Sequence, residues 1–274
     1  MSASMEHDTA PSHQLFDELR ALAAAGPVVV AHRGASCSHP ENTVPAFAAA
    51  AALGVVMQEF DVQQTRDGVL VCCHDVSLDR TTDASEKIGP GALVAQIDYA
   101  ELGRLDAGSW FRPAFAAARI PTLDEVLTAI GEHGIALIEH KGGEPASYVE
   151  ALRRLGRAER SIVQSFDWTF VAACHELEPR NALAVLGPIP RHDSLDDAAI
   201  AEARRCGAGM VHWRLDALRV EQVRAAHAAG LAVCTYTTDD DAGYLGGAAM
   251  GVDAMCTNVP ERMLMLRAMK PTGQ

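Results

Sequence analysis

Short runs of β-branched and aliphatic residues recur along the chain, separated by longer stretches rich in Ala and Leu. The runs that predict strands are Val28–Ala31, Val55–Val62, Ile135–Glu139, Ser161–Gln164, Leu183–Leu186, Gly209–His212, Ala232–Thr237 and Val252–Thr257. Between most of them, apolar residues spaced three and four apart predict helices over Thr43–Leu53, Leu123–Glu132, Tyr148–Leu155, Trp168–Leu177, Asp197–Cys206, Leu218–Ala229 and Asp239–Met250. Such alternation is typical of parallel strands joined by crossover helices.

The number of strand and helix units favours an α/β fold of the TIM-type (β/α)8 barrel. A doubly wound sheet fits less well, because no Gly-rich nucleotide-binding loop follows the first strand. The length of 274 residues agrees with one barrel, which takes about 250 residues. We therefore expect an N-terminal extension and helix over residues 1–26, followed by a single barrel over residues 27–274.

One segment departs from this rhythm. Thr65–Gly68 forms a turn sequence, and a second β run follows it over Val69–Cys73, ending at His74. So short a turn joins only antiparallel strands, and the run should fold back beside the second barrel strand. The stretch of about residues 76–121 fits neither a strand nor a long helix. We expect it to be an insertion over the active-site face, with a plain surface excursion as the alternative.

Composition and charge mainly restrict the partners. Hydrophobic residues make up 49% of the chain, which is enough to bury a sizeable core. The formal net charge of -13 argues against binding to nucleic acid or to anionic membranes, since both require an excess of Lys and Arg on one face. A phosphate substrate would therefore need local positive charge, from a metal ion or from a few placed cations.

Cysteine usage and apolar tracts bear on the compartment. The seven cysteines are an odd number and include the neighbours Cys72 and Cys73, which favours reduced thiols over a disulfide framework. Met1–Ser12 shows no apolar core of a secretory signal, and Ala46–Met57 is shorter than the roughly 20 residues that span a bilayer. These features predict a cytoplasmic protein without stable membrane insertion, and they leave the oligomeric state open.

Reactive side chains gather at the predicted strand ends. They are His32 and Arg33 after the first strand, Glu59 and Asp61 on the second, His74 after the return strand, and Glu139 and Lys141 at the next. The C-terminal ends of the strands form the active-site face of a (β/α)8 barrel. Residues two apart on a strand point the same way, so Glu59 and Asp61 should share one direction.

The three carboxylates of Glu59, Asp61 and Glu139 predict a metal site. Like charges in a half-buried pocket repel by roughly several kcal/mol unless they are neutralised, and carboxylate oxygens suit Mg²⁺ or Ca²⁺, with Mn²⁺ also possible. The alternative is that each carboxylate pairs with a nearby Arg or Lys. His32 and His74 beside such a metal suggest an acid and a base, because imidazole titrates near neutral pH.

The cations and the other histidines complete the candidate site. Arg33 and Lys141 can bind the non-bridging oxygens of a phosphate group. The remaining histidines receive no assigned role, although His39, His140 and His212 lie closest to the predicted strand ends.

The order and spacing of these residues resemble the glycerophosphodiester phosphodiesterase family. The first half of the chain carries His32-Arg33-Gly34, Pro40-Glu41-Asn42-Thr43, Glu59-x-Asp61, Thr65–Gly68, His74-Asp75 and Leu78-x-Arg80-Thr81-Thr82. The likeness continues through Pro121–Leu127, Glu139-x-Lys141, Gln164–Phe166, Gly230–Val233 and Thr257–Pro260. The resemblance therefore covers nearly the whole chain from Val28 onward.

The resemblance implies an enzyme that hydrolyses glycerophosphodiesters to sn-glycerol 3-phosphate and an alcohol with a divalent metal. The residue roles that it implies are His32 and His74 as the acid/base pair, Arg33 and Lys141 as phosphate ligands, and Glu59, Asp61 and Glu139 as metal ligands. It also implies that the insertion covers the site near the glycerol end. Attack by the adjacent glycerol hydroxyl, giving a cyclic phosphate, and direct attack by water both remain open.

Two positions depart from the family pattern. Tyr236 stands where the family usually has Trp, so the apolar wall expected for glycerol binding is kept and a hydroxyl is added. Asn258 stands where the family often has Asp, which removes a charge at the last strand end without touching the metal ligands. We expect hydrolysis to survive the change at Asn258, whereas Tyr236 bears on which substrate is preferred.

Two alternative functions fit the same sequence. A lysophospholipase D-type phosphodiesterase would need an apolar groove, which Leu93, Trp110, Phe111 and Phe115 could line, although packing within the insertion's own core is the favoured interpretation. A non-catalytic barrel that only binds a phosphoester or a protein is disfavoured, because both histidines and all three carboxylates are present.

Overall fold

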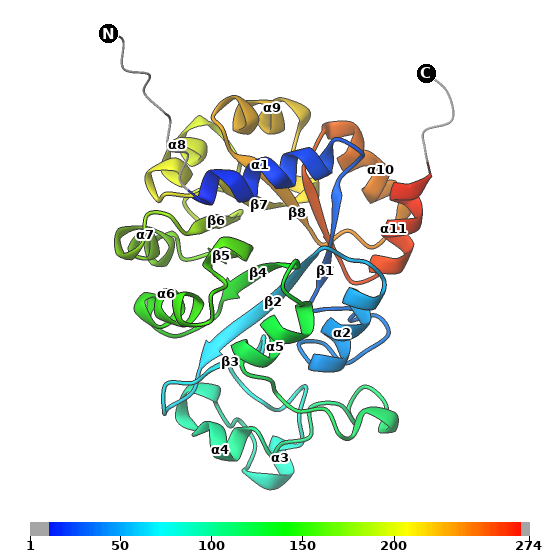
Figure 1. Ribbon diagram of the computed structural model, residues 1–274, viewed down its shortest axis with the longest axis vertical. Coiled ribbons are helices and arrows are strands. Elements are labelled where there is room, and N and C mark those ends of the chain that lie inside the picture. The colour runs from blue at the N-terminus through cyan, green and yellow to red at the C-terminus, as the bar shows by residue number, and fades with distance from the viewer. Residues whose placement is uncertain (1–10, 270–274) are drawn as a thin grey trace.

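A computed structural model describes residues 11–269, in which eight parallel strands close into a barrel surrounded by helices (Figure 1). The barrel strands are β1 (Val28–His32), β2 (Met57–Gln64), β4 (Ile135–His140), β5 (Ser161–Ser165), β6 (Ala182–Gly187), β7 (Met210–Arg214), β8 (Ala232–Tyr236) and β9 (Ala254–Thr257). Neighbours pair in chain order, and β1 pairs in parallel with both β2 and β9, which closes the barrel. The predicted TIM-type (β/α)8 fold is confirmed.

Each barrel strand is followed by an outer helix that leads to the next strand or, after β9, ends the described chain. The outer helices are α2 (Val44–Ala52), α5 (Leu123–Ile130), α6 (Pro145–Arg154), α7 (Trp168–Leu177), α8 (Asp197–Arg205), α9 (Val220–Ala228), α10 (Asp241–Met250) and α11 (Pro260–Ala268). Single-turn 3-10 helices occur at Ala158–Arg160 and Leu215–Ala217. Local sequence fixes several starts: Thr122 and Glu125 form a capping box on α5, and the Asp167 side chain accepts backbone N–H bonds from α7.

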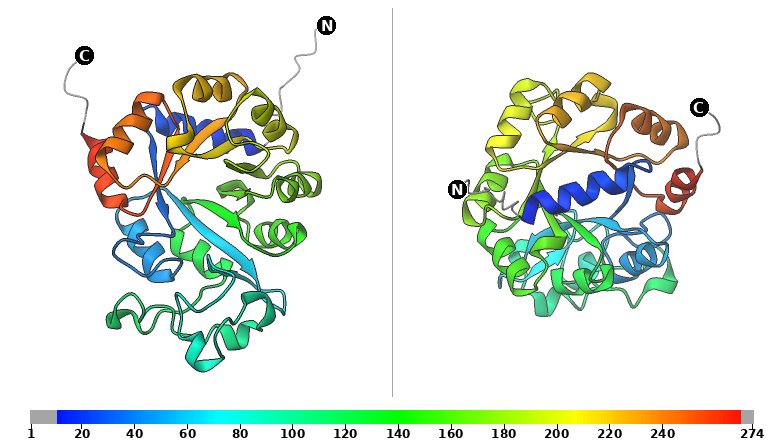
Figure 2. Two further views of the ribbon diagram at one scale, coloured as in Figure 1. Left: turned by 180° about the vertical axis from the view of Figure 1, so that it is seen from behind. Right: turned by 45° about the horizontal axis from the view of Figure 1, so that its top comes forward.

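The helix α1 (Pro11–Ala23) lies across one end of the barrel (Figures 1 and 2). Leu15, Phe16 and Leu19 of this helix pack against the inward-facing residues at the N-terminal ends of the barrel strands. Residues 1–10 of the expected N-terminal extension lie outside the described residues. Because α1 covers the N-terminal ends of the strands, the opposite end carries the polar site.

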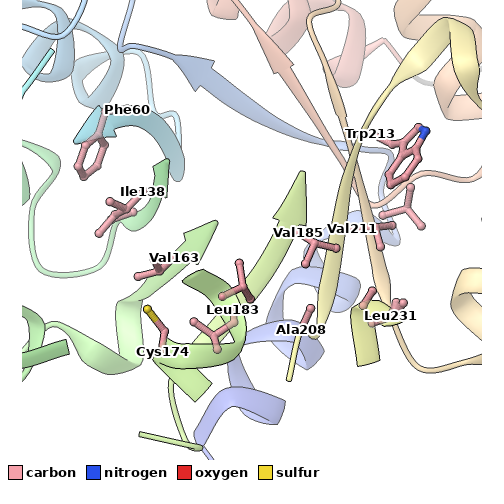
Figure 3. Packing of buried hydrophobic residues seen from close by; sticks show 14 of the residues in the cluster. Phe60, Ile138, Val163, Cys174, Leu183, Val185, Ala208, Val211, Trp213 and Leu231 are labelled. Carbon is pink, nitrogen blue, oxygen red and sulfur yellow. The ribbon is translucent and has the colours of Figure 1, made fainter. Parts of the chain in front are cut away.

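The period-two alternation of each strand separates two hydrophobic layers. Val30 and Met57 point into the barrel, whereas Phe60, Ile138 and Val163 pack outward beneath the helices (Figure 3). Burying each of these side chains contributes about 1.5–3 kcal/mol. On β2 the inward positions continue from apolar Met57 to two acidic residues, so the barrel interior turns polar toward the C-terminal end of its strands.

A hairpin extends the sheet beyond the barrel at β2. The strand β3 (Leu70–Cys72) runs antiparallel to β2, with Leu70 opposite Gln64 and Cys72 opposite Val62. The backbone N–H of Cys73 donates to the carbonyl of Asp61 at 3.1 Å, so the hairpin returns His74 to the level of Asp61 on β2. The predicted return strand is confirmed.

Short helices make up the chain between β3 and α5. They are α3 (Ala84–Lys87), α4 (Tyr99–Leu102) and the 3-10 turns Val94–Gln96 and Pro113–Phe115. Buried Leu78, Val94, Leu102 and Leu105 form a core here that continues into β3, and Figure 1 shows this region beyond the end of the β2 arrow. Trp110, Phe111 and Phe115 lie outside that core, and Trp110 is 40% exposed. Their expected packing within the insertion's core is wrong.

All seven cysteines are free thiols. None of the helices within residues 11–269 has the length and apolar character needed to cross a bilayer.

Candidate active site

The carboxylates of Glu59, Asp61 and Glu139 converge at the C-terminal end of the barrel. Glu59 and Asp61 come from β2 and Glu139 from the neighbouring β4, where it is paired in register with Asp61. One oxygen of each lies within 4.8 Å of one oxygen of the others, and all three side chains are buried. Burial, with Asp61 and Glu139 nearby, raises the pKa of Glu59 well above its ordinary value. Burial and Asp61 also raise the pKa of Glu139 to about 7, against the opposing effect of Lys141.

Two cations neutralise this acidic cluster in part. The Arg33 Nε lies 3.1 Å from Asp61 Oδ2, and the Lys141 ammonium contacts Glu139 and lies 3.5 Å from Asp61 Oδ1. Glu59 is left without such a partner: its Oε1 is buried and accepts no hydrogen bond within residues 11–269. Its Oε2 accepts only a 3.3 Å hydrogen bond from the Arg33 backbone N–H. Pairing with Arg and Lys therefore does not account for the whole cluster.

A divalent cation fits the donor set that remains. Hard cations such as Mg²⁺ and Ca²⁺ bind carboxylate oxygens, and here such oxygens are buried and close together. The Asn42 side chain holds one of them, because its Nδ2 donates to Asp61 Oδ2 at 2.8 Å. Orienting hydrogen bonds of this kind commonly support metal ligands.

His32 ends β1 beside the carboxylates. Its Nδ1 lies 2.7 Å from Asn258 Oδ1, and its Nε2 lies 3.8 Å from Glu59 Oε2. An amide oxygen can only accept, so the proton of the neutral ring sits on Nδ1 and the lone pair is on Nε2. Burial, followed by the Arg33 charge, lowers the pKa of His32.

His74 has a different kind of partner. Its Nδ1–H donates to Asp75 Oδ1 at 2.5 Å, and Asp75 Oδ2 accepts from Arg80 Nε. Arg80 also donates to both oxygens of Glu41, at 2.8 and 2.9 Å, and Glu41 pairs with Arg33 at 2.7 Å. The hydrogen bond from Arg80 holds the pKa of Asp75 down at about 2. One histidine therefore faces a neutral amide and the other faces an anion.

The sequence from His32 onward matches a known family. The family model described as "Glycerophosphoryl diester phosphodiesterase family" covers residues 32–262. The chain belongs to this family. A glycerophosphodiester phosphodiesterase of Bacillus subtilis (strain 168) is 32% identical over 255 residues, covering 85% of this chain and 84% of the relative. A second, from Caldanaerobacter subterraneus subsp. tengcongensis, is 32% identical over 250 residues, covering 87% and 97%.

Solved structures give the same result. A phosphodiesterase of Oleispira antarctica, in complex with the product sn-glycerol-3-phosphate, superposes with a TM-score of 0.77 at 27% identity, covering 87% of this chain and 96% of that one. A glycerophosphodiester phosphodiesterase of Agrobacterium tumefaciens str. C58 reaches 0.76 at 28% identity, covering 87% and 99%. As a member of the glycerophosphoryl diester phosphodiesterase family, the chain is an enzyme, a phosphoric diester hydrolase.

Several supporting residues of this family member had no role in the sequence analysis. Asn42 orients Asp61, and Glu41, Asp75 and Arg80 link Arg33 to His74 through ion pairs. Each of them lies in an ordered motif that carried the resemblance. That position in a motif was the only signal that could have indicated them, since their pairing across the insertion is a tertiary contact.

Aromatic rings pack together beside the carboxylate cluster. The Tyr236 hydroxyl donates to the Gly187 carbonyl at 2.8 Å, and its ring packs against Phe166 and His212 with centroids 6.1 and 5.1 Å apart. Lys141 Nζ lies 6.0 Å from the Phe166 ring centre, which connects these rings to the carboxylates. Burial and Glu139 raise the pKa of Tyr236 to about 12, so the hydroxyl stays protonated.

The remaining nearby histidines lie at the edge of the site or beneath it. His212 is fully buried on β7, with Nδ1 2.8 Å from Gln164 Oε1, and His140 stacks on Phe170. His39 contacts Phe115 at the insertion. None of the three contacts the carboxylates in the described structure.

Proposed function

We propose that this enzyme hydrolyses glycerophosphodiesters to sn-glycerol 3-phosphate and an alcohol with the help of a divalent metal. The observation that carries the proposal is the cluster of three buried carboxylates with His32 beside it. His74 is joined to the same cluster through ion pairs that run from its partner Asp75 to Arg33. The names of the curated relatives and the product bound in the Oleispira structure support the substrate class.

Glu59, Asp61 and Glu139 would hold the metal, with Mg²⁺ or Ca²⁺ as the first candidates and Mn²⁺ as a further one. When bound, the ion supplies Lewis-acid stabilisation of negative charge on a phosphoryl oxygen. Arg33 and Lys141 would bind non-bridging oxygens from either side, since each already lies among the metal ligands.

The hydrogen bonds of the two histidines favour different roles. Neutral His32 has a lone pair on Nε2 and would take the proton of the attacking hydroxyl, from water or from the adjacent glycerol oxygen. As that oxygen bonds to phosphorus, the bond to the alcohol oxygen breaks, and His74 would give a proton to this leaving oxygen. The Asp75 carboxylate stabilises positive charge on His74. Proton transfers of this kind contribute about 10²- to 10⁴-fold to the rate.

Tyr236 would form the apolar wall for the glycerol end, as Trp does in much of the family. Its hydroxyl already donates to Gly187, so only the ring is available for the substrate. The insertion would cover this end of the site. Arg80 supports that placement, because it ties the insertion to Glu41 in the loop after β1.

The decisive experiment is turnover of glycerophosphocholine and glycerophosphoethanolamine with and without a chelator. We expect release of sn-glycerol 3-phosphate that the chelator abolishes and an added divalent metal restores. Absence of release with Mg²⁺, Mn²⁺ and Ca²⁺, together with no effect of chelator on the thermal midpoint, would instead support the non-catalytic barrel.

A second candidate function is lysophospholipase D-type hydrolysis. It is favoured by the aromatic side chains of the insertion: Trp110 contacts Phe111 with ring centroids 5.7 Å apart, and Phe111 contacts Phe115 at 5.8 Å. These rings are exposed or only half-buried and offer an apolar surface near the loop after β1. Hydrolysis of lysophosphatidylcholine but not of glycerophosphocholine, lost in Trp110→Ala, would replace the first proposal with this one.

A further inference from the structure

We infer that Asp239 is a positioning residue that fixes the orientation of the Asn258 side-chain amide and, through it, the tautomer of His32. The inference rests on the proposed function in one respect, namely that His32 acts as the base.

Asp239 and Asn258 follow neighbouring parallel strands. The strands β8 and β9 are paired at Cys234–Ala254 and Thr235–Met255, and the two residues lie just beyond their C-terminal ends. Asp239 Oδ1 accepts the Asn258 backbone N–H at 2.7 Å, and Asp239 Oδ2 accepts the Asn258 side-chain Nδ2 at 2.7 Å. The Asp239 carboxylate therefore accepts hydrogen bonds from both the backbone and the side chain of Asn258.

These contacts fix which way the amide points. A carboxylate can only accept hydrogen bonds, so the NH₂ end of Asn258 has to face Asp239. Its oxygen then faces His32 Nδ1 at 2.7 Å and also accepts the Ser36 hydroxyl at 3.0 Å. A donor on one side and an acceptor on the other thus select the same orientation.

The orientation of the amide determines where the His32 proton sits. With the Asn258 oxygen toward Nδ1, the proton is on Nδ1 and the Nε2 lone pair is free for catalysis. A half-turn of the amide would bring NH₂ to Nδ1, which would move the proton to Nε2 and leave no base there. An amide partner on the wrong tautomer is costly: in the Ser-His-Asp triad, changing Asp to Asn lowers kcat by about 10⁴.

The family pattern that the sequence resembles often has Asp at the position of Asn258. A carboxylate there would accept from Nδ1–H in either orientation and would need no second group to orient it. In this chain the group next to His32 is an amide, whose oxygen and nitrogen ends differ. The carboxylate stands on the far side of that amide from His32, at Asp239. The two positions together therefore hold one carboxylate and one amide.

The test is a swap of the two side chains, read by steady-state kinetics. Asp239→Asn removes the group that orients the amide, so we expect kcat to fall about tenfold or more while KM and metal affinity stay near wild type. Asn258→Asp alone places two carboxylates against each other and should also impair turnover. The double variant Asp239→Asn/Asn258→Asp restores one carboxylate and one amide and should recover kcat to within a few-fold of wild type, a strongly non-additive result.

A control and a direct observation of the ring complete the test. Asp241→Asn, at the first residue of α10 and partly exposed, loses its ion pair with Arg262 and should keep wild-type kcat. Two-dimensional ¹⁵N NMR of the imidazole, assigned with His32→Gln, should show the Nδ1–H tautomer in wild type and the Nε2–H tautomer in Asp239→Asn.

The two readouts separate the inference from the proposed function. If no glycerophosphodiester is hydrolysed but Asp239→Asn changes the tautomer, the proposed function fails and the inference stands. An unchanged His32 tautomer in Asp239→Asn overturns the inference. So does a double variant that remains as inactive as Asp239→Asn.

Discussion

The hydroxyl of Tyr236 donates to the backbone carbonyl of Gly187 at 2.8 Å, so the one polar atom of this ring already has a partner within the protein. Tyr236→Phe should therefore change kcat and KM for glycerophosphocholine by no more than a few-fold. It should lower the free energy of unfolding by about 1 kcal/mol, the usual contribution of one hydrogen bond. Tyr236→Ala, which removes the wall, should raise KM. Altered preference among alcohols in Tyr236→Phe would show that the hydroxyl contacts the substrate.

His32→Ala and His74→Ala should each lower kcat by about 10²- to 10⁴-fold, because each removes a proton acceptor or donor. Both side chains lie at the barrel mouth and not in its hydrophobic core, so the urea midpoint should stay close to that of wild type. His133→Ala, on an exposed turn, is the matched control and should keep full activity. Turnover at the wild-type rate in either mutant would remove that histidine from the mechanism.

Glu59→Gln tests the metal ligands with two opposite expectations. Without metal, the variant should be more stable than wild type, because a buried like charge beside Asp61 and Glu139 is gone. With Mg²⁺ or Ca²⁺, only wild type should gain a large increase in thermal midpoint, since binding stabilises the folded state. Calorimetric titration measures the affinity directly, with exposed Glu132→Gln as the control. Equal metal affinity in wild type and Glu59→Gln would move the metal site elsewhere.

His212 makes the stability depend on pH. Burial lowers its pKa from the ordinary 6.5 to about 3 in the folded protein, so the folded state stays unprotonated where the unfolded chain takes up a proton. The contribution of His212 to the free energy of unfolding is fully present above pH 6.5 and decreases as the pH drops from 6.5 toward 3. At pH 5 the loss amounts to about 2 kcal/mol.

The corresponding variant is His212→Asn, which keeps a donor for Gln164 but does not titrate. Denaturant unfolding at pH 7 and pH 5 should show a smaller acid-side loss in His212→Asn than in wild type. His133→Gln should follow wild type at both values. Parallel pH curves for wild type and His212→Asn would contradict a buried, neutral His212.

The sequence alone was sufficient for the barrel and for the convergence of the three carboxylates, because continuous apolar runs alternate with stretches of helical periodicity. Glu59 and Asp61 are two apart on one strand, so their shared direction follows from the pleat. The fold-back that brings His74 to the rim followed from the turn at Thr65–Gly68. In both cases the decisive information is local, within a few residues along the chain.

The supporting contacts could not be predicted in this way. Asp239 meets Asn258, and Arg80 meets Glu41, only after strands and insertion are placed in three dimensions. Exposed rings such as Trp110 were assigned to a core, because an aromatic residue in a loop carries no periodicity that indicates its direction. Hydrogen-bond partners depend on side-chain orientation, which neither spacing nor composition records.

The strand β3 affects how this enzyme would lose activity on heating. The barrel is closed by eight strands that do not include β3. His74 follows the end of β3, which pairs with β2 through three residue pairs. Local unfolding of that hairpin would separate His74 from the three carboxylates while the parallel strands of the barrel stay intact. Activity should therefore be lost at a lower temperature than the one at which the barrel unfolds. A different hairpin at this position would change the residue beside the carboxylates and leave the barrel as it is.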